Sequence, residues 1–377
     1  MIKRMSVALE LQPCIGKRSG IGNFTYELAK RLYNTEHLQF YGNLFNFRGR
    51  NDNASSLVGI KMPVVECRGF PYGVYRRLWH WLPVSYDKLF AAADLSVFFN
   101  YIVPPKLSGR VLTTVHDLTW LRYPETMDKK NLRRIKKDIA YSIERADRVL
   151  TISEFSKREI VELLGIGEER VCLVPCAATA MQSGTDFEQI KQKLALANPY
   201  LLYIGNIEPR KNLPRLLQAF DLLKSEQGIA HKLVIAGGNG WGNAEFQQAL
   251  AALRYAGDVV QAGYVEPGEK RALYENADVF VFPSIYEGFG IPPLEAMECG
   301  CPVVCANAAS LPEVVGEAAE LVEPISVSSI AEGIWRVISD ESRAVELAAK
   351  GYEQAKKFSW EKSATKLKAV CREVLGV

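Results

Sequence analysis

Three segments of the chain share one pattern, and this pattern limits the possible folds more than any other feature of the sequence. They are ADLSVFFN (93–100), ADRVLTIS (146–153) and ADVFVFPS (277–284), and each runs from Ala-Asp through apolar residues to Ser or Asn. Continuous apolar runs of this length are typical of strands that are buried on both faces of a parallel sheet. The final Ser or Asn is a residue type that begins a following helix. Such units in both halves of the chain predict an α/β fold with helices covering parallel sheets.

The order of strands and helices predicts two Rossmann-like α/β/α domains that face each other across a cleft, where ligands bind in such folds. We expect the first domain at residues 1–178 and the second at residues 199–356, joined by a polar linker at 179–198. Residues 357–377 predict an amphipathic helix that packs back on the first domain. In the helix predicted from residue 213, Asn212 is the expected cap.

Composition excludes several classes of protein. The chain has 377 residues, of which 48% are hydrophobic, but it has neither a secretory leader nor an apolar run near 20 residues, so we expect a cytoplasmic protein. Eight cysteines in a chain of this length do not indicate a disulfide scaffold. Cys299, Cys301 and Cys305 form a cluster with no histidine nearby, and we interpret them as small buried hydrophobes. We therefore predict no structural metal.

The stretch SIYEGFGIPPLEAMECG (284–300) places two carboxylates, Glu287 and Glu295, around a turn that follows a predicted strand. Gly288 and Gly290 allow main-chain N–H groups to approach a ligand beside the start of a helix, which favours anions. Ionised carboxylates, in contrast, accept hydrogen bonds from neighbouring sugar hydroxyls. Taken alone, the stretch fits equally well a simple turn with a solvated Glu287 and a Glu295 that balances the helix dipole.

A second motif favours the ligand-binding interpretation. In YIGNIEPRKNLPRLLQAF (203–220), Arg210 and Lys211 come directly before a predicted helix. Cations at a helix N-terminus oppose the helix dipole, so an anionic ligand is expected to compensate them. Together with the helix amides, the Arg fork and the Lys charge can clamp a diphosphate.

Two motifs in the first half add candidate residues. RSGIGNFTYEL (18–28) has Gly20 and Gly22 before a helix predicted to begin near Asn23. It is not a dinucleotide fingerprint, because Thr25 stands where the third glycine belongs, and this argues against an oxidoreductase. TTVHDLTW (113–120) places His116 at the end of a strand, where a functional role is favoured over a structural one.

Together, GNIEPRKN (205–212) and EGFGIPPLEAM (287–297) resemble the retaining nucleotide-sugar glycosyltransferases of family 4, which have the GT-B fold. The resemblance covers nearly the whole chain and is strongest from 200 to 322. HDLTWLRYPE (116–125) resembles a subgroup of mannosyl- and rhamnosyltransferases of polysaccharide assembly.

The resemblance implies a role for each matching residue. Arg210 and Lys211 would bind the donor diphosphate and stabilise the leaving nucleotide, and His116 would lie beside the transferred sugar. Glu287 would bind the hydroxyls of that sugar, and Glu295 the ribose diol. Further implied donor-binding residues are Gly20, Gly22, Asn206, Gly263, Tyr264, Val265, Gly288, Phe289, Gly290 and Ile291. The implied mechanism is front-face attack without a metal or any other cofactor.

The first half of the chain is basic, and this bears on the acceptor. Residues 1–178 contain 27 Lys and Arg against 18 Asp and Glu, whereas the remaining residues contain 19 against 25. Cations and aromatic residues of 72–83 and 128–145 predict a face for a lipid-diphosphate acceptor or an anionic membrane. This face consists of Arg76, Arg77, Trp79, Lys129, Lys130, Arg133, Arg134, Lys136 and Lys137. A solvated basic helix and an aromatic core segment are the plainer alternatives, and no nucleic-acid motif accompanies the charge.

The sequence and the resemblance lead to one functional hypothesis. We expect a retaining hexosyltransferase that moves α-mannose from GDP-mannose onto a glycan on polyprenyl diphosphate. The setting would be bacterial surface polysaccharide synthesis, O-antigen or capsule, with peripheral contact to anionic lipids on the cytoplasmic face of the inner membrane. Two alternatives are a rhamnosyltransferase that uses a GDP- or dTDP-sugar and a non-catalytic nucleotide-sugar-binding protein.

Overall fold

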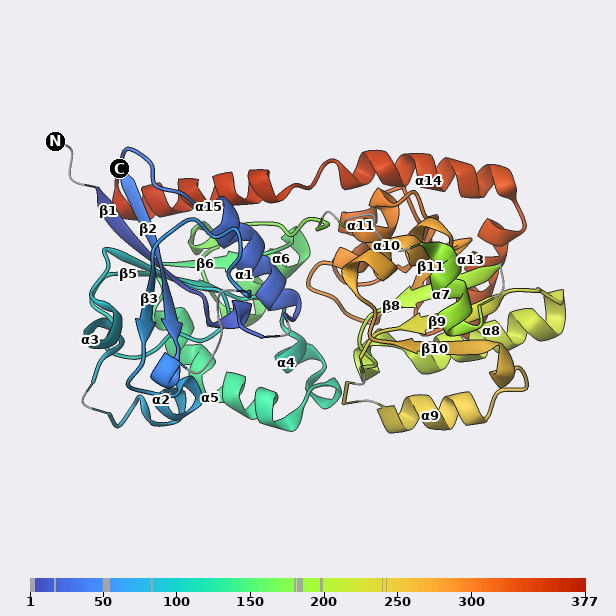
Figure 1. Cartoon of the computed structure of the whole chain (residues 1–377), viewed down its shortest axis with the longest axis horizontal. Helices are drawn as coiled ribbons and strands as arrows, with labels where there is room; N and C mark the ends of the chain where they lie inside the picture. The colour runs from blue at the N-terminus through green and yellow to red at the C-terminus, as the bar shows by residue number, and fades with distance from the viewer. Residues whose placement is uncertain are drawn as a thin grey trace. The chain divides into compact units, whose positions relative to one another are not determined.

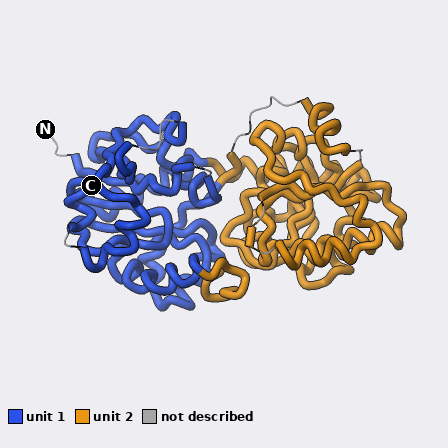
Figure 2. The backbone as a smooth tube through the Cα atoms, turned by 60° about the horizontal axis from the view of Figure 1, so that its bottom comes forward, with its two compact units in different colours: residues 1–118, 130–176, 360–377 blue, residues 119–129, 177–359 orange. Residues whose placement is uncertain are grey.

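The computed structural model describes residues 4–16, 18–49, 55–82, 84–179, 181, 186–196, 199–238, 240–241 and 243–377. The chain divides into two compact units (Figure 2). Unit 1 comprises Met1–Leu118, Lys130–Cys176 and Trp360–Val377, and unit 2 comprises Thr119–Lys129 and Ala177–Ser359. Each unit contains one parallel sheet with helices packed against it, so the predicted α/β class is confirmed (Figure 1).

The sheet of unit 1 has seven strands among the described residues, in the order β3-β2-β1-β4-β5-β6-β7. The strands are β1 (Met5–Glu10), β2 (Leu38–Phe45), β3 (Val64–Cys67), β4 (Leu95–Phe98), β5 (Arg110–Thr114), β6 (Arg148–Thr151) and β7 (Val171–Leu173). The helices are α1 (Gly20–Arg31), α2 (Tyr72–Leu78), α3 (Tyr86–Phe90), α5 (Lys129–Arg145), α6 (Glu154–Leu164) and α15 (Trp360–Leu375). Strand order reverses between β1 and β4, which makes the carboxyl end of β1 the usual ligand position of such a sheet.

The sheet of unit 2 has six strands in the part of the chain that is described, in the order β10-β9-β8-β11-β12-β13. The strands are β8 (Tyr200–Ile204), β9 (Lys232–Ala236), β10 (Val259–Gly263), β11 (Val279–Phe282), β12 (Val303–Ala306) and β13 (Glu320–Val322). The helices are α4 (Thr119–Arg122), α7 (Phe187–Leu194), α8 (Leu213–Gln227), α9 (Asn243–Ala251), α10 (Pro267–Glu275), α11 (Ile291–Glu298), α12 (Leu311–Val315), α13 (Val327–Ile338) and α14 (Glu341–Ala355). Here the strand order reverses between β8 and β11.

The three Ala-Asp segments form β4, β6 and β11, and the structure gives a physical reason for their shared aspartate. In each case the carboxylate accepts a hydrogen bond from a main-chain N–H of the first or second residue of the neighbouring strand. Asp94 accepts from Ser6 at 2.7 Å, Asp147 accepts from Val111 at 2.8 Å, and Asp278 accepts from Tyr200 at 2.9 Å. The carboxylate thus provides a hydrogen-bond acceptor for a main-chain N–H near the start of the paired strands.

The final Ser or Asn of these segments behaves differently from the prediction in two of three cases. Ser153 caps α6, because its Oγ accepts a hydrogen bond from Ser156 N at 3.0 Å. Asn100 and Ser284, in contrast, precede loops, and the helix after Ser284 begins only at Ile291. The intervening loop in unit 2 is part of the candidate site described below.

The units differ from the predicted domains in two places, at residues 119–129 and in the predicted linker. Residues 119–129, inside the predicted first domain, belong to unit 2, where Trp241 Nε1 donates to Thr126 O at 2.5 Å. The predicted linker contains a helix, α7. The terminal helix α15 belongs to unit 1 and packs on α1, with Arg31 Nε at 2.7 Å from Glu361 Oε1.

Among the described residues, no helix combines the length and the apolar character that a membrane span needs.

The aspartate at the start of β6 provides a test of the shared pattern. Replacing Asp147 with Ala leaves the buried Val111 N–H without its acceptor, so the free energy of unfolding should fall by about 1–3 kcal/mol. Asp147→Asn keeps an acceptor oxygen and should lose less. Urea unfolding of unit 1 measures both, and an alanine variant as stable as the parent chain would contradict this role.

Candidate functional site

The candidate site lies at the carboxyl ends of β8 and β11, the strands between which the order of the sheet reverses. Two loops meet here: residues 205–212 follow β8 and residues 283–290 follow β11. Ile285 N donates to Arg210 O at 2.9 Å, which ties the loops together. The location is where open parallel sheets usually bind ligands.

Asn212 connects this site to the rest of unit 2, in a different way from the one predicted. Its φ of 62° is left-handed, and its side chain does not cap α8. Instead, Nδ2 donates to the carbonyls of Pro283 at 3.0 Å and Pro324 at 2.6 Å. The buried amide therefore holds the loop after β11 in place, because two carbonyls depend on it.

Arg210, Lys211 and Glu287 form one ionic cluster at this position. Arg210 Nη1 lies 2.6 Å from Glu287 Oε2, and Lys211 Nζ lies 2.5 Å from Glu287 Oε1. Only 7% of Glu287 and 8% of Lys211 are exposed to solvent. The structure thus brings Glu287 to Arg210 and Lys211, which lie 77 and 76 positions earlier in the chain.

Electrostatics keep the central carboxylate ionised. Burial alone would raise the pKa of Glu287, but the charges and hydrogen bonds of Arg210 and Lys211 outweigh it and lower this pKa to about 2. Burial and the neighbouring Arg210 lower the pKa of Lys211, although Glu287 and Glu208 oppose this shift. Arg210 Nε also lies 3.4 Å from Glu208 Oε2, so the two cations face two carboxylates, and an anionic ligand would compete with these for the cations.

This arrangement can exchange one anion for another. In the free chain Glu287 contacts both Arg210 and Lys211, and Glu208 adds a second carboxylate beside Arg210. A diphosphate bound to the two cations would supply negative charge in place of Glu287. The carboxylate of Glu287 would then be available to accept hydrogen bonds from sugar hydroxyls.

The main chain around Glu287 is held by a residue that the sequence analysis did not identify. Buried Ser310 Oγ lies 2.8 Å from Glu287 O and 2.9 Å from Phe289 O. Gly290 has a φ of 111°, and a Cβ there would lie 2.6 Å from the Leu311 side chain. Gly290 also precedes the first turn of α11, where no side chain caps the free amides.

Glu295 occupies a separate place in the same unit. Its carboxylate contacts Lys270 Nζ and lies 3.3 Å from the Tyr274 hydroxyl. Lys270 and Tyr274 are four residues apart and therefore share one face of α10, a spacing that gave no signal by itself. These contacts do not test the binding of Glu295 to ribose, which stays a prediction.

The predicted base-binding residues lie at the end of the edge strand β10. Gly263 has a φ of 66°, its carbonyl accepts from Gly237 N at 2.6 Å, and half of Tyr264 is exposed. Two strand spacings, about 10 Å, separate β10 from β8. A nucleoside can extend over this distance from a diphosphate at β8. Asn206, after β8, points its amide at Glu208 at 3.5 Å.

His116 and the glycine motif belong to unit 1. His116 Nε2 lies 2.7 Å from the carbonyl of Phe99, so Nε2 carries the proton and Nδ1 can accept. Burial lowers the pKa of this imidazole, which is therefore neutral at pH 7. Helix α1 begins at Gly20, earlier than predicted, and a Cβ on Gly22 would lie 2.5 Å from Pro13 O. Close packing against Pro13 therefore explains why glycine is needed at position 22.

The predicted acceptor face needs one correction. Trp79 is only 4% exposed because its ring packs against Tyr75, whereas Trp81 is 83% exposed. The aromatic side chain on this surface is therefore Trp81. The six basic residues predicted on α5 are all exposed, as expected for a surface face.

Metal-binding side chains do not converge in the described part of the chain: it contains no group of three or more His, Cys, Asp or Glu residues suited to an ion. Its cysteines are free thiols, and Cys301 and Cys305 are buried.

Two Rossmann-like units, one of which carries a cation cluster at its ligand position, are the features of a GT-B glycosyltransferase. Residues 186–358 match the family described as glycosyl transferases group 1, and residues 18–179 match glycosyltransferase family 4. An Escherichia coli protein named O-antigen chain mannosyltransferase B is 33% identical over 96% of this chain and 98% of its own length. The chain belongs to the family 4 glycosyltransferases.

Solved structures show the same fold. Sucrose-phosphate synthase from Thermosynechococcus elongatus has a TM-score of 0.75 at 19% identity and covers 99% of this chain and 100% of its own. Anabaena Alr3699/HepE, in complex with UDP and glucose, has a TM-score of 0.72 at 18% identity, and the match covers 98% of this chain and 100% of the Anabaena chain. The predicted GT-B fold and the predicted class of enzyme, a sugar transferase, are confirmed.

The ionic cluster should stabilise unit 2 in a pH-dependent way. Because the pKa of Glu287 is about 2 in the folded chain and near 4.5 in the unfolded one, its contribution is present above pH 4.5 and is lost as the pH falls through 2. Glu287→Gln should therefore lower the free energy of unfolding by about 3 kcal/mol at pH 7. The difference from the parent chain should shrink toward pH 2, as measured by urea unfolding. A difference that does not change with pH would contradict the assignment.

Proposed function

We propose that this chain is a retaining mannosyltransferase that uses GDP-mannose and builds a bacterial surface polysaccharide, O-antigen or capsule. The observation that carries the proposal is the cluster of Arg210, Lys211 and Glu287 at the reversal point of the second sheet. It combines two cations for a diphosphate with a carboxylate for sugar hydroxyls. The name of the Escherichia coli relative, which aligns over nearly its whole length, supports mannose and O-antigen.

The chemistry follows from these residues. The acceptor hydroxyl oxygen forms a bond to the anomeric carbon while the bond from that carbon to the phosphate oxygen breaks. The departing oxygen takes the acceptor proton on the same face of the sugar, so the configuration is retained. Arg210 and Lys211 stabilise the growing negative charge of the diphosphate in a buried setting, where such interactions are strong. We expect no metal requirement, because these cations supply the positive charge.

In this proposal Glu287 and His116 each bind a hydroxyl group of the sugar. Glu287 binds hydroxyl groups of the sugar once the diphosphate has replaced Glu287 as the partner of Arg210 and Lys211. His116 is neutral, so its Nδ1 accepts a hydrogen bond from a sugar hydroxyl while Nε2 remains bound to Phe99 O. Both contacts position the sugar without forming a covalent intermediate, in contrast to hydrolases that use a carboxylate nucleophile.

The acceptor is, in our proposal, a glycan linked to polyprenyl diphosphate at the cytoplasmic face of the inner membrane. The exposed basic residues of α5 support contact with anionic lipids, because each such charge near a negative membrane surface is attractive.

The nucleotide can be identified by ligand-induced stabilisation. A ligand that binds only the folded chain raises its melting temperature, and saturation at 100 times Kd is worth about 2.7 kcal/mol. GDP should therefore stabilise the chain more than UDP, dTDP or ADP at equal concentration. GDP-mannose with a lipid-linked acceptor should release GDP faster than GDP- or dTDP-rhamnose releases its nucleotide. Stronger stabilisation by dTDP would favour a rhamnosyl donor instead, and no release with any donor would favour a binding protein.

Glu287→Gln should separate nucleotide binding from sugar transfer. Without the competing carboxylate, GDP should bind at least as tightly as to the parent chain, as measured by calorimetry. Transfer of the sugar should fall about 100-fold or more, because a charged hydrogen-bond acceptor is lost. Glu226→Gln, an exposed residue of α8, is the matched control and should change neither quantity. Weaker GDP binding with unchanged turnover would contradict this role of Glu287.

A further inference from the structure

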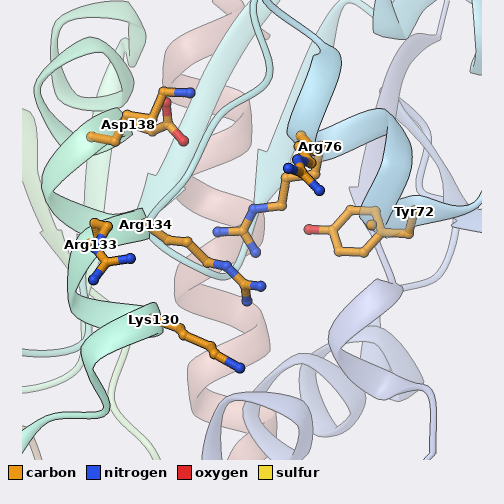
Figure 3. Close-up of a pocket in the computed structure, with 9 residues that line it drawn as sticks. Tyr72, Arg76, Lys130, Arg133, Arg134 and Asp138 are labelled. Carbon is orange, nitrogen blue, oxygen red and sulfur yellow. The ribbon is translucent and has the colours of Figure 1, made fainter.

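A basic pocket of about 700 Å³ lies within unit 1, between α2 and α5. Six cations line it: Arg76, Arg77, Lys130, Arg133, Arg134 and Lys137. The four that come from α5 have helical spacing, so they share one face of that helix. Figure 3 shows the side chain of Arg134 extending from α5 to the vicinity of Arg76 of α2.

The charge of this pocket is not balanced within the described residues. The one carboxylate that lines it there, Asp138, is hydrogen-bonded to His80 Nε2 at 3.1 Å. Four of the cations form no ion pair anywhere in the described part of the chain: Arg77, Arg133, Arg134 and Lys137. Like charges held close together repel one another, so a bound anion would stabilise the pocket.

A buried carboxyl group next to the pocket gives independent evidence for a ligand. Glu10 ends β1, at the reversal point of the first sheet, and interacts electrostatically with Arg76 and Tyr72 of the pocket. It is 8% exposed, and its Oε1 has no hydrogen-bond partner. Buried polar atoms without partners are rare in proteins, and this one lies where such sheets bind ligands.

The protonation of Glu10 preserves the positive charge of the pocket. Burial raises its pKa to about 8, although Arg76 opposes the shift. The carboxyl group is therefore mainly neutral at pH 7, and it can donate a hydrogen bond as well as accept one.

An exposed apolar strip lies on another face of α2 and on the turn that follows this helix. Val74, Leu78 and Trp81 have helical spacing and are 47%, 41% and 83% exposed. Apolar side chains beside cations are typical of surfaces that lie in the headgroup region of a membrane. An anion that binds here is therefore expected to be carried by a lipid.

We propose that this pocket binds the diphosphate group of a lipid-linked acceptor, with the guanidinium groups of Arg76 and Arg134 as its main donors. Arginine forks match phosphate oxygens in pairs, and the many cations suit a multiply charged group better than a single carboxylate. The pocket is also large enough for the first sugar beside the diphosphate. The lipid-linked nature of the acceptor rests on the proposed function, whereas the diphosphate site itself rests on the pocket.

Titration with inorganic pyrophosphate tests the site directly. With saturating GDP present to occupy Arg210 and Lys211 of unit 2, the parent chain should still bind pyrophosphate, and Arg134→Gln should weaken this binding about tenfold. Lys366→Gln, which removes one exposed charge from α15 in the same unit, should bind like the parent chain. Thermal melting verifies that the exposed substitutions leave the fold intact. Absence of binding by the parent chain, or equal binding by both variants, would overturn the proposal.

Vesicles distinguish a lipid diphosphate from a charged membrane surface. Neutral phosphatidylcholine vesicles that contain a polyprenyl diphosphate should bind the parent chain more tightly than phosphatidylglycerol vesicles of equal charge. Arg134→Gln should remove this preference. Lys136→Gln, on the same helix but outside the pocket, should weaken binding to phosphatidylglycerol and keep the preference. Equal binding to both kinds of vesicle would mean that the basic residues attract any anionic membrane surface, and it would overturn the proposal.

Failure of this inference can be told apart from failure of the proposed function. Stabilisation by GDP reports on unit 2 and should be the same in Arg134→Gln and in the parent chain. If GDP-mannose is used but pyrophosphate is not bound, the pocket assignment alone is wrong. If pyrophosphate is bound but no donor is used, the pocket stands and the proposed transfer is wrong.

Discussion

The ion cluster in which Glu287 joins Arg210 to Lys211 is the interaction on which the candidate site depends. It connects the loop after β8 to the loop after β11, and these loops meet because the two strands are neighbours in the sheet. Asn212 and Ser310 hold the same loops through main-chain carbonyls. Removal of Arg210, Lys211 or Glu287 would leave a buried charge without a partner, which is unfavourable. The intact cluster therefore holds the two loops in place before any ligand binds.

Both sheets are built with the same device at their opposite, amino-terminal edge. An aspartate directly before β4, β6 and β11 accepts a hydrogen bond from a main-chain N–H near the start of the neighbouring strand; these residues are Asp94, Asp147 and Asp278. These contacts support the start of the sheet, whereas ligands bind at the other end of parallel strands. Stability and chemistry are therefore placed at different ends of the same sheet, and loops can vary for function without loss of the scaffold.

The sequence predicts those parts of the molecule that leave a local pattern. β4, β6 and β11 are continuous apolar runs, and Arg210, Lys211 and Glu287 belong to distinctive motifs, so they were identifiable. Other features depend on contacts between distant segments. Lys270 and Ser310 are ordinary residues in their own segments, and only folding brings them to Glu295 and to the loop after β11. Trp79 and Asn212 were assigned by residue type, but packing buried the first and redirected the hydrogen bonds of the second.

The central claim is that Glu287 holds the place of a diphosphate at Arg210 and Lys211. A crystal structure of the chain with GDP tests it most directly. The account predicts that diphosphate oxygens lie within hydrogen-bond distance of both cations and that at least one contact of Glu287 with these cations has opened. A nucleotide bound with its diphosphate elsewhere, while Glu287 still pairs with Arg210 and Lys211, would contradict it.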